Sequence, residues 1–192
     1  MEMQIFRKEL RFIDVPETML KWMNLGGRPS NFNPKGARSF ELELVEDDAI
    51  FLFDNGWRVK KRGYDPDKDK FVNTSDMDAD LEKATYKMKI TVNYDSNNPP
   101  KIYRVVEGQK TRRLMKPDAE NADYDVGKID NDAIVSCDLI INGWKSSRDG
   151  IISPFLDTAI FVVRENSVLD KWSNFDIEDD DGVTPWEENT RE

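Results

Sequence analysis

Apolar and polar residues alternate with a period of two in several stretches of this chain. Residues 40–44, 86–94 and 133–141 each place apolar side chains at alternate positions. Successive side chains of a β-strand point to opposite faces, so this spacing predicts strands with one buried and one solvated face. A further apolar strand is expected over residues 150–163. The pattern therefore predicts a mainly β protein.

Turn and loop signals separate these strands. Residues 102–114 are expected to form a hairpin with basic arms. Asn55-Gly56 predicts another hairpin turn, because this dipeptide is among the strongest hairpin signals. Residues 14–36 and 62–80, rich in turn-forming residues, are expected to be an irregular arm and a long surface loop. Short helical segments are expected around residues 19–23, 76–83 and 165–175.

The number and spacing of the expected strands favour a small β-barrel or sandwich. Among small barrels, the OB-fold tolerates long connecting loops and binds single strands on one face. We therefore expect an OB-fold-like barrel of five to six strands, with long loops and a short helix or two. The chain divides into an N-terminal arm and first strand (1–36), the OB-like β-barrel (37–164), and a short helix with an acidic disordered tail (165–192).

Charge is distributed unevenly along the chain. Residues 176–192 carry eight acids against one base, which is −7 of a total net charge of −10. The stretch from Lys101 to Lys116 carries six bases against one acid, Glu107. A basic surface combined with an acidic tail occurs in proteins that bind a polyanion and compete for it with their own tail. A solvated basic hairpin with a merely solubilising tail is the alternative.

Several classes of chemistry are excluded by composition. The chain has no histidine and a single cysteine, Cys137, so Ser–His–Asp catalysis, Cys–His catalysis and a disulfide framework are ruled out. Neither a phosphate-binding Gly-Lys-Ser/Thr loop nor a Gly-x-Gly-x-x-Gly motif occurs. Cys137 alternates with apolar neighbours, which predicts a buried structural thiol. We expect no enzyme activity and no cofactor.

Targeting and metal signals are weak. The N-terminus does not resemble a signal peptide, and no run of ~18 apolar residues is present to span a membrane, so we expect a cytoplasmic protein without a membrane partner. Asp65, Asp67 and Asp69 resemble the start of a calcium loop, but Lys70 stands where that loop requires glycine. A solvated acidic loop is therefore expected there, and no metal site.

Basic and aromatic residues are interleaved in a way that suits single-stranded nucleic acid. Cations track the phosphates, while aromatic rings stack on bases of any kind. Trp57, Tyr103 and Trp144 are the stacking candidates, although the turns beside Trp57 and Trp144 leave open whether those rings are exposed or in the core. The residues predicted to contact DNA are Lys35, Arg38, Trp57, Lys60, Lys61, Arg62, Lys87, Lys89, Tyr103, Arg104, Lys110, Arg112, Arg113, Trp144 and Lys145.

A sequence of loose motifs resembles the bacteriophage single-stranded DNA-binding proteins. The segment 33–36, Asn-Pro-Lys-Gly, runs into the strand 40–45 as at the start of the barrel in that family. The likeness continues in the basic stretch 101–116 and in residues 127–164, which contain a Trp-Lys turn and a final apolar strand. The acidic tail completes the order of parts, although it ends in Thr-Arg-Glu with Trp186 set back from the end, whereas family tails end in an aromatic residue.

The resemblance implies an OB-fold that binds single-stranded DNA without base selectivity, in phage DNA replication and recombination in the host cytoplasm. It also implies an acidic C-terminal tail that competes with DNA and contacts replication or recombination proteins. The resemblance does not decide whether the protein forms a homodimer.

The sequence leaves two other classes of function open. A viral structural or assembly module would use the basic hairpin and the tail for protein contacts, and an exposed apolar patch would favour it. Nuclease chemistry with a carboxylate-bound metal would require acids gathered around a bound ion.

Overall fold

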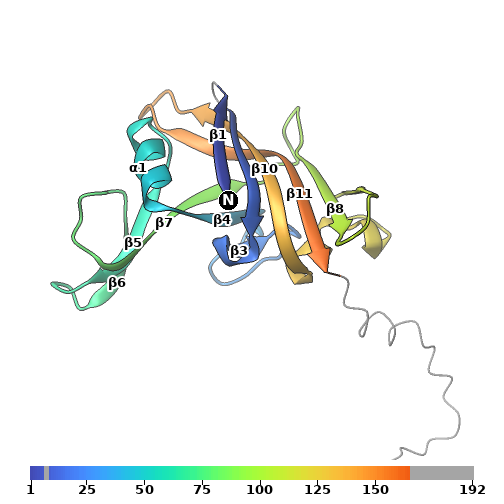
Figure 1. Cartoon of the computed structure of the whole chain (residues 1–192), viewed down its shortest axis with the longest axis horizontal. Coiled ribbons are helices and arrows are strands. Elements are labelled where there is room, and N and C mark those ends of the chain that lie inside the picture. Colours follow the sequence, from blue (N-terminus) through green and yellow to red (C-terminus); the bar gives the residue numbers. More distant parts are fainter. Residues whose placement is uncertain (7–8, 165–192) are drawn as a thin grey trace, which may run out of the picture.

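The computed structural model describes residues 1–6 and 9–164, which fold mainly into β-strands (Figure 1). The strands are β1 (Glu2–Phe6), β2 (Glu9–Pro16), β3 (Leu20–Asn24), β4 (Ser39–Leu44), β5 (Lys60–Asp65), β6 (Lys70–Thr74), β7 (Glu82–Thr91), β8 (Lys101–Val106), β9 (Arg113–Met115), β10 (Ala133–Lys145) and β11 (Ile152–Arg164). The helical elements are the α-helix α1 (Glu46–Asp54) and the 3-10 turns η1 (Glu17–Met19), η2 (Ala122–Tyr124) and η3 (Val126–Asn131). The expectation of a mainly β chain is confirmed.

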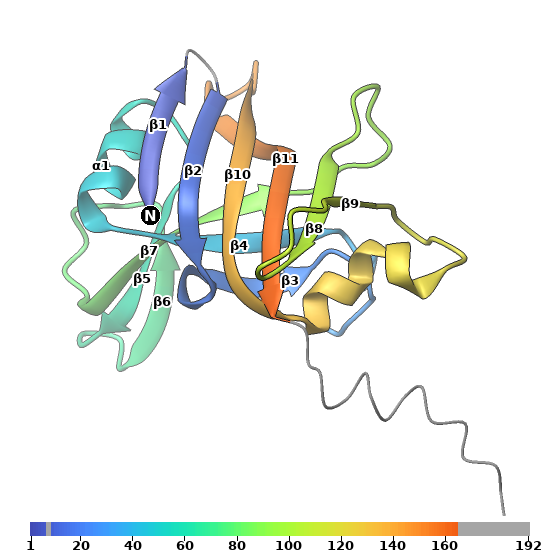
Figure 2. The same cartoon turned by 45° about the vertical axis from the view of Figure 1, so that its right-hand side comes forward.

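All of these strands belong to one hydrogen-bonded sheet. Its main path is β1-β2-β10-β11-β7-β4-β3, with β5 and β6 branching from β7 and with β8 and β9 branching from β11. Figure 2 shows β1, β2, β10, β11 and β8 side by side across the front of the molecule. The path is not closed by a further pairing among the described strands, so the barrel and the OB-fold stay predictions.

The period-two pattern of the sequence builds the core as expected. Along β7, Tyr86, Met88 and Ile90 are buried and alternate with two lysines, and along β4 the side chains of Phe40 and Leu42 are fully buried. These strands lie antiparallel and pair directly, so their buried faces coincide. One continuous hydrophobic cluster includes buried residues of β2, β10 and β11, of β4 and β7, and of α1.

The Asn55-Gly56 signal was wrong as a hairpin prediction, because it ends the helix α1. Gly56 has a φ of +82°, a left-handed conformation that glycine adopts without strain. The Gly56 N–H donates to the Phe53 carbonyl at 2.8 Å, and the Trp57 N–H donates to the Leu52 carbonyl at 2.9 Å. These two bonds form a Schellman cap, which satisfies carbonyls at the helix end. A helix cap and a hairpin turn both need positive φ, so the dipeptide alone cannot separate them.

The predicted surface loop 62–80 was wrong for residues 62–74, although residues 75–81 do form a loop, and the short helix around 76–83 was also wrong. Residues 60–74 form the β5–β6 hairpin, and β7 starts at Glu82. At the turn, the Asp65 carboxylate accepts hydrogen bonds from two backbone N–H groups and from Lys68 Nζ at 2.7 Å. These contacts, with the Lys68 hydrogen bond as the largest cause, lower the pKa of Asp65. The first acid of the calcium-like stretch therefore stabilises the turn.

The N-terminal arm is more regular than expected. Strand β2 runs to Pro16 and pairs with β10, and β3 occupies the region where a helical turn was predicted. Residues 115–132 hold this arm in place, because the Asp130 carboxylate accepts from the N–H groups of Leu25 (2.8 Å) and Gly26 (2.9 Å). The helix expected over 165–175 and the acidic tail lie outside the described residues.

Candidate nucleic-acid interface

The basic hairpin β8–β9 presents one inner and one outer face. Ile102 and Met115 are direct cross-strand partners and both are buried, which makes theirs the inner face. Side chains alternate along each strand, so the next pair, Tyr103 and Leu114, lies on the outer face. Tyr103 is half-buried and Leu114 is 42% exposed. On the adjacent parallel strand β11, Ile160 pairs with Tyr103 and extends this apolar surface.

Cations surround this surface. Lys101 and Lys116 follow the same alternation, and Lys110 and Arg112 lie in the connection between the two strands. All four are exposed, and none of them forms an ion pair with the part of the chain that the structure describes. We define the hairpin face by these cations and the apolar side chains between them: Lys101, Tyr103, Lys110, Arg112, Leu114, Lys116, Thr158 and Ile160.

The two other arginines of the hairpin turn away from this face. Arg104 is only 7% exposed, and its Nε donates to the Asp132 carboxylate at 2.7 Å, which joins β8 to the start of β10. Arg113, its cross-strand partner, is half-buried and lies over the Tyr124 ring at 5.1 Å. Both were predicted to contact DNA, but the structure gives their charges to contacts within the protein.

A second group of predicted residues lies on β5 and β7, on a different part of the sheet. Lys87 and Lys89 point outward from β7, but their cross-strand partners on β4 are Glu43 and Glu41. Lys87 Nζ pairs with the Glu41 carboxylate at 2.6 Å. Lys60, opposite Lys87, is exposed. We define the β7 face by these side chains of alternating charge: Lys60, Lys87, Lys89, Glu41 and Glu43.

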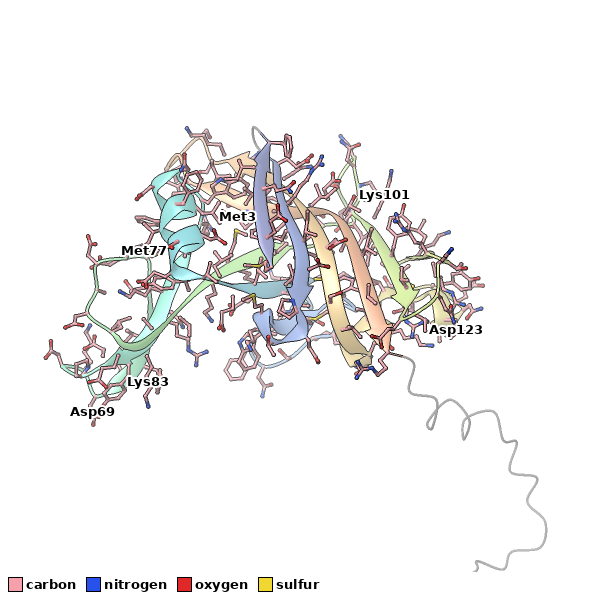
Figure 3. The ribbon with its side chains drawn as sticks, viewed as in Figure 1. Met3, Asp69, Met77, Lys83, Lys101 and Asp123 are labelled. Atoms are coloured by element: carbon pink, nitrogen blue, oxygen red, sulfur yellow. The ribbon has the colours of Figure 1, made fainter. Side chains whose placement is uncertain are left out.

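The neighbouring Lys61 and Arg62 are less exposed than Lys60. Lys61 Nζ donates to the backbone carbonyls of Met77 (3.0 Å) and Ala79 (2.7 Å), so it holds the loop before β7. Arg62 is half-buried within β5. Figure 3 shows Asp69 and Lys83 of this region at the opposite end of the molecule from Lys101.

The two tryptophans whose exposure was left open differ sharply. Trp57 is 6% exposed, because its ring packs against Gly143 of β10, where a Cβ would lie 2.7 Å from the ring atom Cη2. Trp144 is 60% exposed near the end of β10, and Lys145 beside it is also exposed. They lie at the tip of the β10–β11 hairpin, away from the hairpin face (Figure 1).

The remaining predicted residues precede β4. Lys35 is exposed, whereas Arg38 is committed to contacts within the protein. Its Nε donates to the Leu25 carbonyl and its Nη2 to the Asp118 carboxylate, each at 3.0 Å. Thus only Tyr103, Lys110 and Arg112 of the predicted set come together on the hairpin face.

Sequence reasoning missed the contributions of Lys101, Leu114 and Lys116 to this face, and of the β11 side chains. Alternation within the basic stretch was a usable signal, since it separates 101 and 103 from 102 and 104. The sequence did not show that β11 lies beside β8, because this parallel pairing joins segments that are far apart in the chain.

Few groups in the described part of the chain suit other chemistry. Burial raises the pKa of the Cys137 thiol, which disfavours the reactive thiolate. No cluster of three or more acidic or cysteine side chains suited to a metal occurs within residues 1–6 and 9–164. None of the helices in the described residues has the length and apolar character needed to cross a membrane.

Cations around an aromatic side chain are the combination that proteins use to bind single-stranded nucleic acid, and the hairpin face has this combination at Tyr103. Comparison with known families agrees with this class: a family model described as "Putative phage ssDNA-binding domain" matches residues 2–190. The match spans nearly the whole chain, so the chain belongs to this phage single-stranded DNA-binding family. No curated protein and no solved structure gives a significant match.

Proposed function

We propose that this protein binds single-stranded DNA on the hairpin face, with little dependence on base sequence, during phage DNA replication and recombination. The observation that carries the proposal is the set of four exposed cations around Tyr103 and Leu114 that lack ion pairs in the described residues. Membership of the phage family supports single-stranded DNA as the ligand.

Each part of the face has a distinct task in this proposal. Lys101, Lys110, Arg112 and Lys116 neutralise phosphates, which positions the strand without reading it. The Tyr103 ring stacks on a base, and Leu114 covers its edge. Four phosphate contacts at ~0.7 each predict that log K falls with log salt with a slope of about −3.

The wider role follows from the same assignment. The chain performs no catalysis in this proposal, and it acts in the host cytoplasm as an OB-type barrel. The acidic segment 176–192, with a net charge of −7, competes with DNA for the cations and contacts replication or recombination proteins. Tethering keeps such a segment at high local concentration, so weak intrinsic attraction is enough.

Fluorescence anisotropy of a labelled oligo-dT tests the proposal directly. This reporter is preferable to tryptophan emission, because Trp57 is buried and Trp144 lies away from the hairpin face. We expect tight binding to oligo-dT, much weaker binding to a duplex of equal length, and a salt slope of about −3. Equal affinity for duplex and single strand, or no binding at low salt, would contradict it.

A second function, protein contact, is favoured by a different observation. The outer side of α1 exposes Ile50 (41%), Phe51 (49%) and Phe53 (37%). The segment after α1 is hydrogen-bonded to the tip of the β10–β11 hairpin, where Trp144 and Ile151 are also exposed. A cluster of large exposed apolar side chains marks protein interfaces. We propose that a second copy of the chain binds here, forming a homodimer.

Sedimentation velocity decides this second proposal. The full chain is expected to sediment as a dimer at micromolar concentration, and Phe51→Arg is expected to convert it to a monomer with an unchanged melting temperature. A wild-type chain that stays monomeric over the whole concentration range would exclude the homodimer.

A further inference from the structure

A hollow of about 470 Å³ opens beside the hairpin face. It lies where the loop before β8 meets the ends of β8 and β9 and a part of β11. Its lining residues include Lys101, Leu114, Lys116 and Thr158 of the hairpin face. A strand bound on that face would therefore pass the mouth of this hollow. Its volume falls in the range of roughly 300–1,000 Å³ of small-molecule sites, which is large enough for one nucleoside.

The walls combine apolar surface with a few polar groups. Pro99 and Pro100 supply rigid apolar surface, Met115 supplies a flexible apolar side chain, and Tyr94 supplies an aromatic ring. The guanidinium of Arg38 lies over that ring, 5.6 Å from its centre. An apolar slot with few polar groups is the usual form of a ligand pocket, and flat rigid walls suit a planar base.

Tyr94 also has an unused hydrogen-bonding group. Its hydroxyl is buried and has no hydrogen-bond partner among the described residues. Leaving such a group unsatisfied costs roughly 1–3 kcal/mol, so an isolated case next to a cavity calls for an explanation. Burial raises the pKa of Tyr94 to about 12, so the hydroxyl stays protonated at physiological pH. Because solvent does not reach this hydroxyl, it lies behind the wall of the hollow, and the Tyr94 ring is what the residue contributes to the lining.

The unexpected member of the lining is an acid, Asp157. One of its carboxylate oxygens accepts from Asn142 Nδ2 at 3.0 Å and the other from Thr158 Oγ1 at 2.9 Å. These bonds orient the carboxylate without neutralising it, and no cation pairs with it in the described chain. A carboxylate has about four acceptor sites, so two remain.

An anion beside a DNA-binding face repels phosphate, but it is a good acceptor for the exocyclic amino group of a base. Aspartate accepts from cytosine N4 in known modes of base recognition. Thymine presents a carbonyl oxygen at the same position, which the carboxylate cannot satisfy.

We propose that this hollow takes one base of the bound strand and that Asp157 selects an amino-bearing base, with cytosine preferred over thymine among the pyrimidines. The inference rests on the proposed single-stranded DNA binding. It adds one composition-sensitive position to a face that otherwise holds phosphates and stacks bases. Lys101 and Lys116 at the rim contact the phosphates on either side of the captured base.

The test compares oligo-dC and oligo-dT of equal length by anisotropy with the full chain at mildly alkaline pH, where cytosine is neutral. Both are weakly stacked pyrimidine strands, so stacking differences are small. One hydrogen bond to a charged acceptor predicts oligo-dC binding about tenfold more tightly. Asp157→Asn is expected to abolish the difference. Asp95→Asn, on the loop beside the hollow, removes the same charge and is expected to preserve it.

A second variant covers the case in which Asp157→Asn lowers the melting temperature. Leu114→Ala removes apolar surface from the hollow and the hairpin face without changing charge. It is expected to weaken binding of both strands about fivefold, with the salt slope unchanged. Unchanged affinity in Leu114→Ala would contradict both the base pocket and the role of Leu114 in the hairpin face, whereas the comparison of oligo-dC with oligo-dT tests the pocket alone.

The outcomes separate the two proposals. Equal affinity for oligo-dC and oligo-dT would overturn the base pocket and leave the proposed function intact. A preference for oligo-dC that persists in a folded Asp157→Asn variant would also overturn it. Failure to bind either strand would contradict the proposed function itself.

Discussion

The hairpin face and the β7 face look alike in the sequence, since both are lysine- or arginine-bearing strands with aromatic residues nearby. In the folded chain they differ in what stands across the sheet. On the β7 face, Lys87 and Lys89 are opposite two glutamates, and Lys87 forms an ion pair of 2.6 Å. On the hairpin face, Tyr103 is opposite Leu114 and Ile160, and the cations around them lack acidic partners in the described part.

The difference shows that a count of basic residues does not locate a polyanion site. Opposite charges across neighbouring strands cancel each other's field, and a paired cation must give up its partner before it binds phosphate. Cations beside apolar surface keep their full attraction for phosphate, and this attraction adds to base stacking. The hairpin face therefore carries the proposed function, although the β7 face has equally basic strands.

The largest effect is expected within the hairpin itself, from Arg104→Ala. This change leaves the Asp132 carboxylate, which is only 13% exposed, without its cation, and breaking such a pair typically costs about 3–5 kcal/mol when it is buried. Urea unfolding is expected to show that loss, while DNA affinity of the folded fraction stays close to that of wild type. Arg113→Ala, on the same inner face but half-buried, is the control and is expected to lose about 1 kcal/mol or less. A stable Arg104→Ala protein with weakened DNA binding would place Arg104 in the interface.

The next largest effect is expected from Tyr103→Ala. Loss of one stacked base costs roughly 1–3 kcal/mol of binding free energy, which is about five- to 150-fold in Kd. The salt slope should not change, because no charge is removed. Trp22→Ala is the matched control, since Trp22 is 73% exposed on β3 but lies off the hairpin face. Equal losses in the two variants would remove Tyr103 from its assigned role.

The comparison of the two faces is sharpened by a pair of double variants with the same change of charge. Lys110→Ala with Arg112→Ala is expected to flatten the salt slope by about 1.4, at ~0.7 per lost phosphate contact. Lys60→Ala with Lys89→Ala removes two exposed cations from the β7 face and is expected to change the slope by less than about 0.3. Anisotropy titrations at several salt concentrations measure both. The reverse ranking would assign DNA to the β7 face.

The smallest effect at physiological salt is expected from truncation after Phe175. The removed segment carries a net charge of −7, and its attraction to the hairpin face is screened over about 8 Å at physiological ionic strength. Single-stranded DNA should bind more tightly to the truncated chain at low salt, and the gain should shrink as salt is added. No gain at low salt would mean that the tail does not compete for the DNA site.

Much of the architecture was readable from the sequence. The strands over 40–44, 86–91 and 133–141, the basic hairpin and the buried Cys137 all followed from the period-two pattern, because alternation across a strand is a local property. Residues 1–36 were expected to contain one strand, whereas the structure has three there, β1, β2 and β3. The β5–β6 hairpin was missed because Gly63, Pro66 and several acids obscure its alternation. The Asn55-Gly56 signal was read as a hairpin because positive φ serves both a turn and a helix cap.

The sequence by itself determined which side chains share a face of each strand, and it excluded histidine and disulfide chemistry. Only the tertiary structure decided which of those faces meets solvent and what stands beside it. Arg104 and Tyr103 are neighbours in the chain. Arg104 forms an ion pair with Asp132, whereas Tyr103 faces outward beside Leu114. The reason is that burial and charge pairing are set by long-range partners, here β11 and the start of β10, which local spacing does not encode.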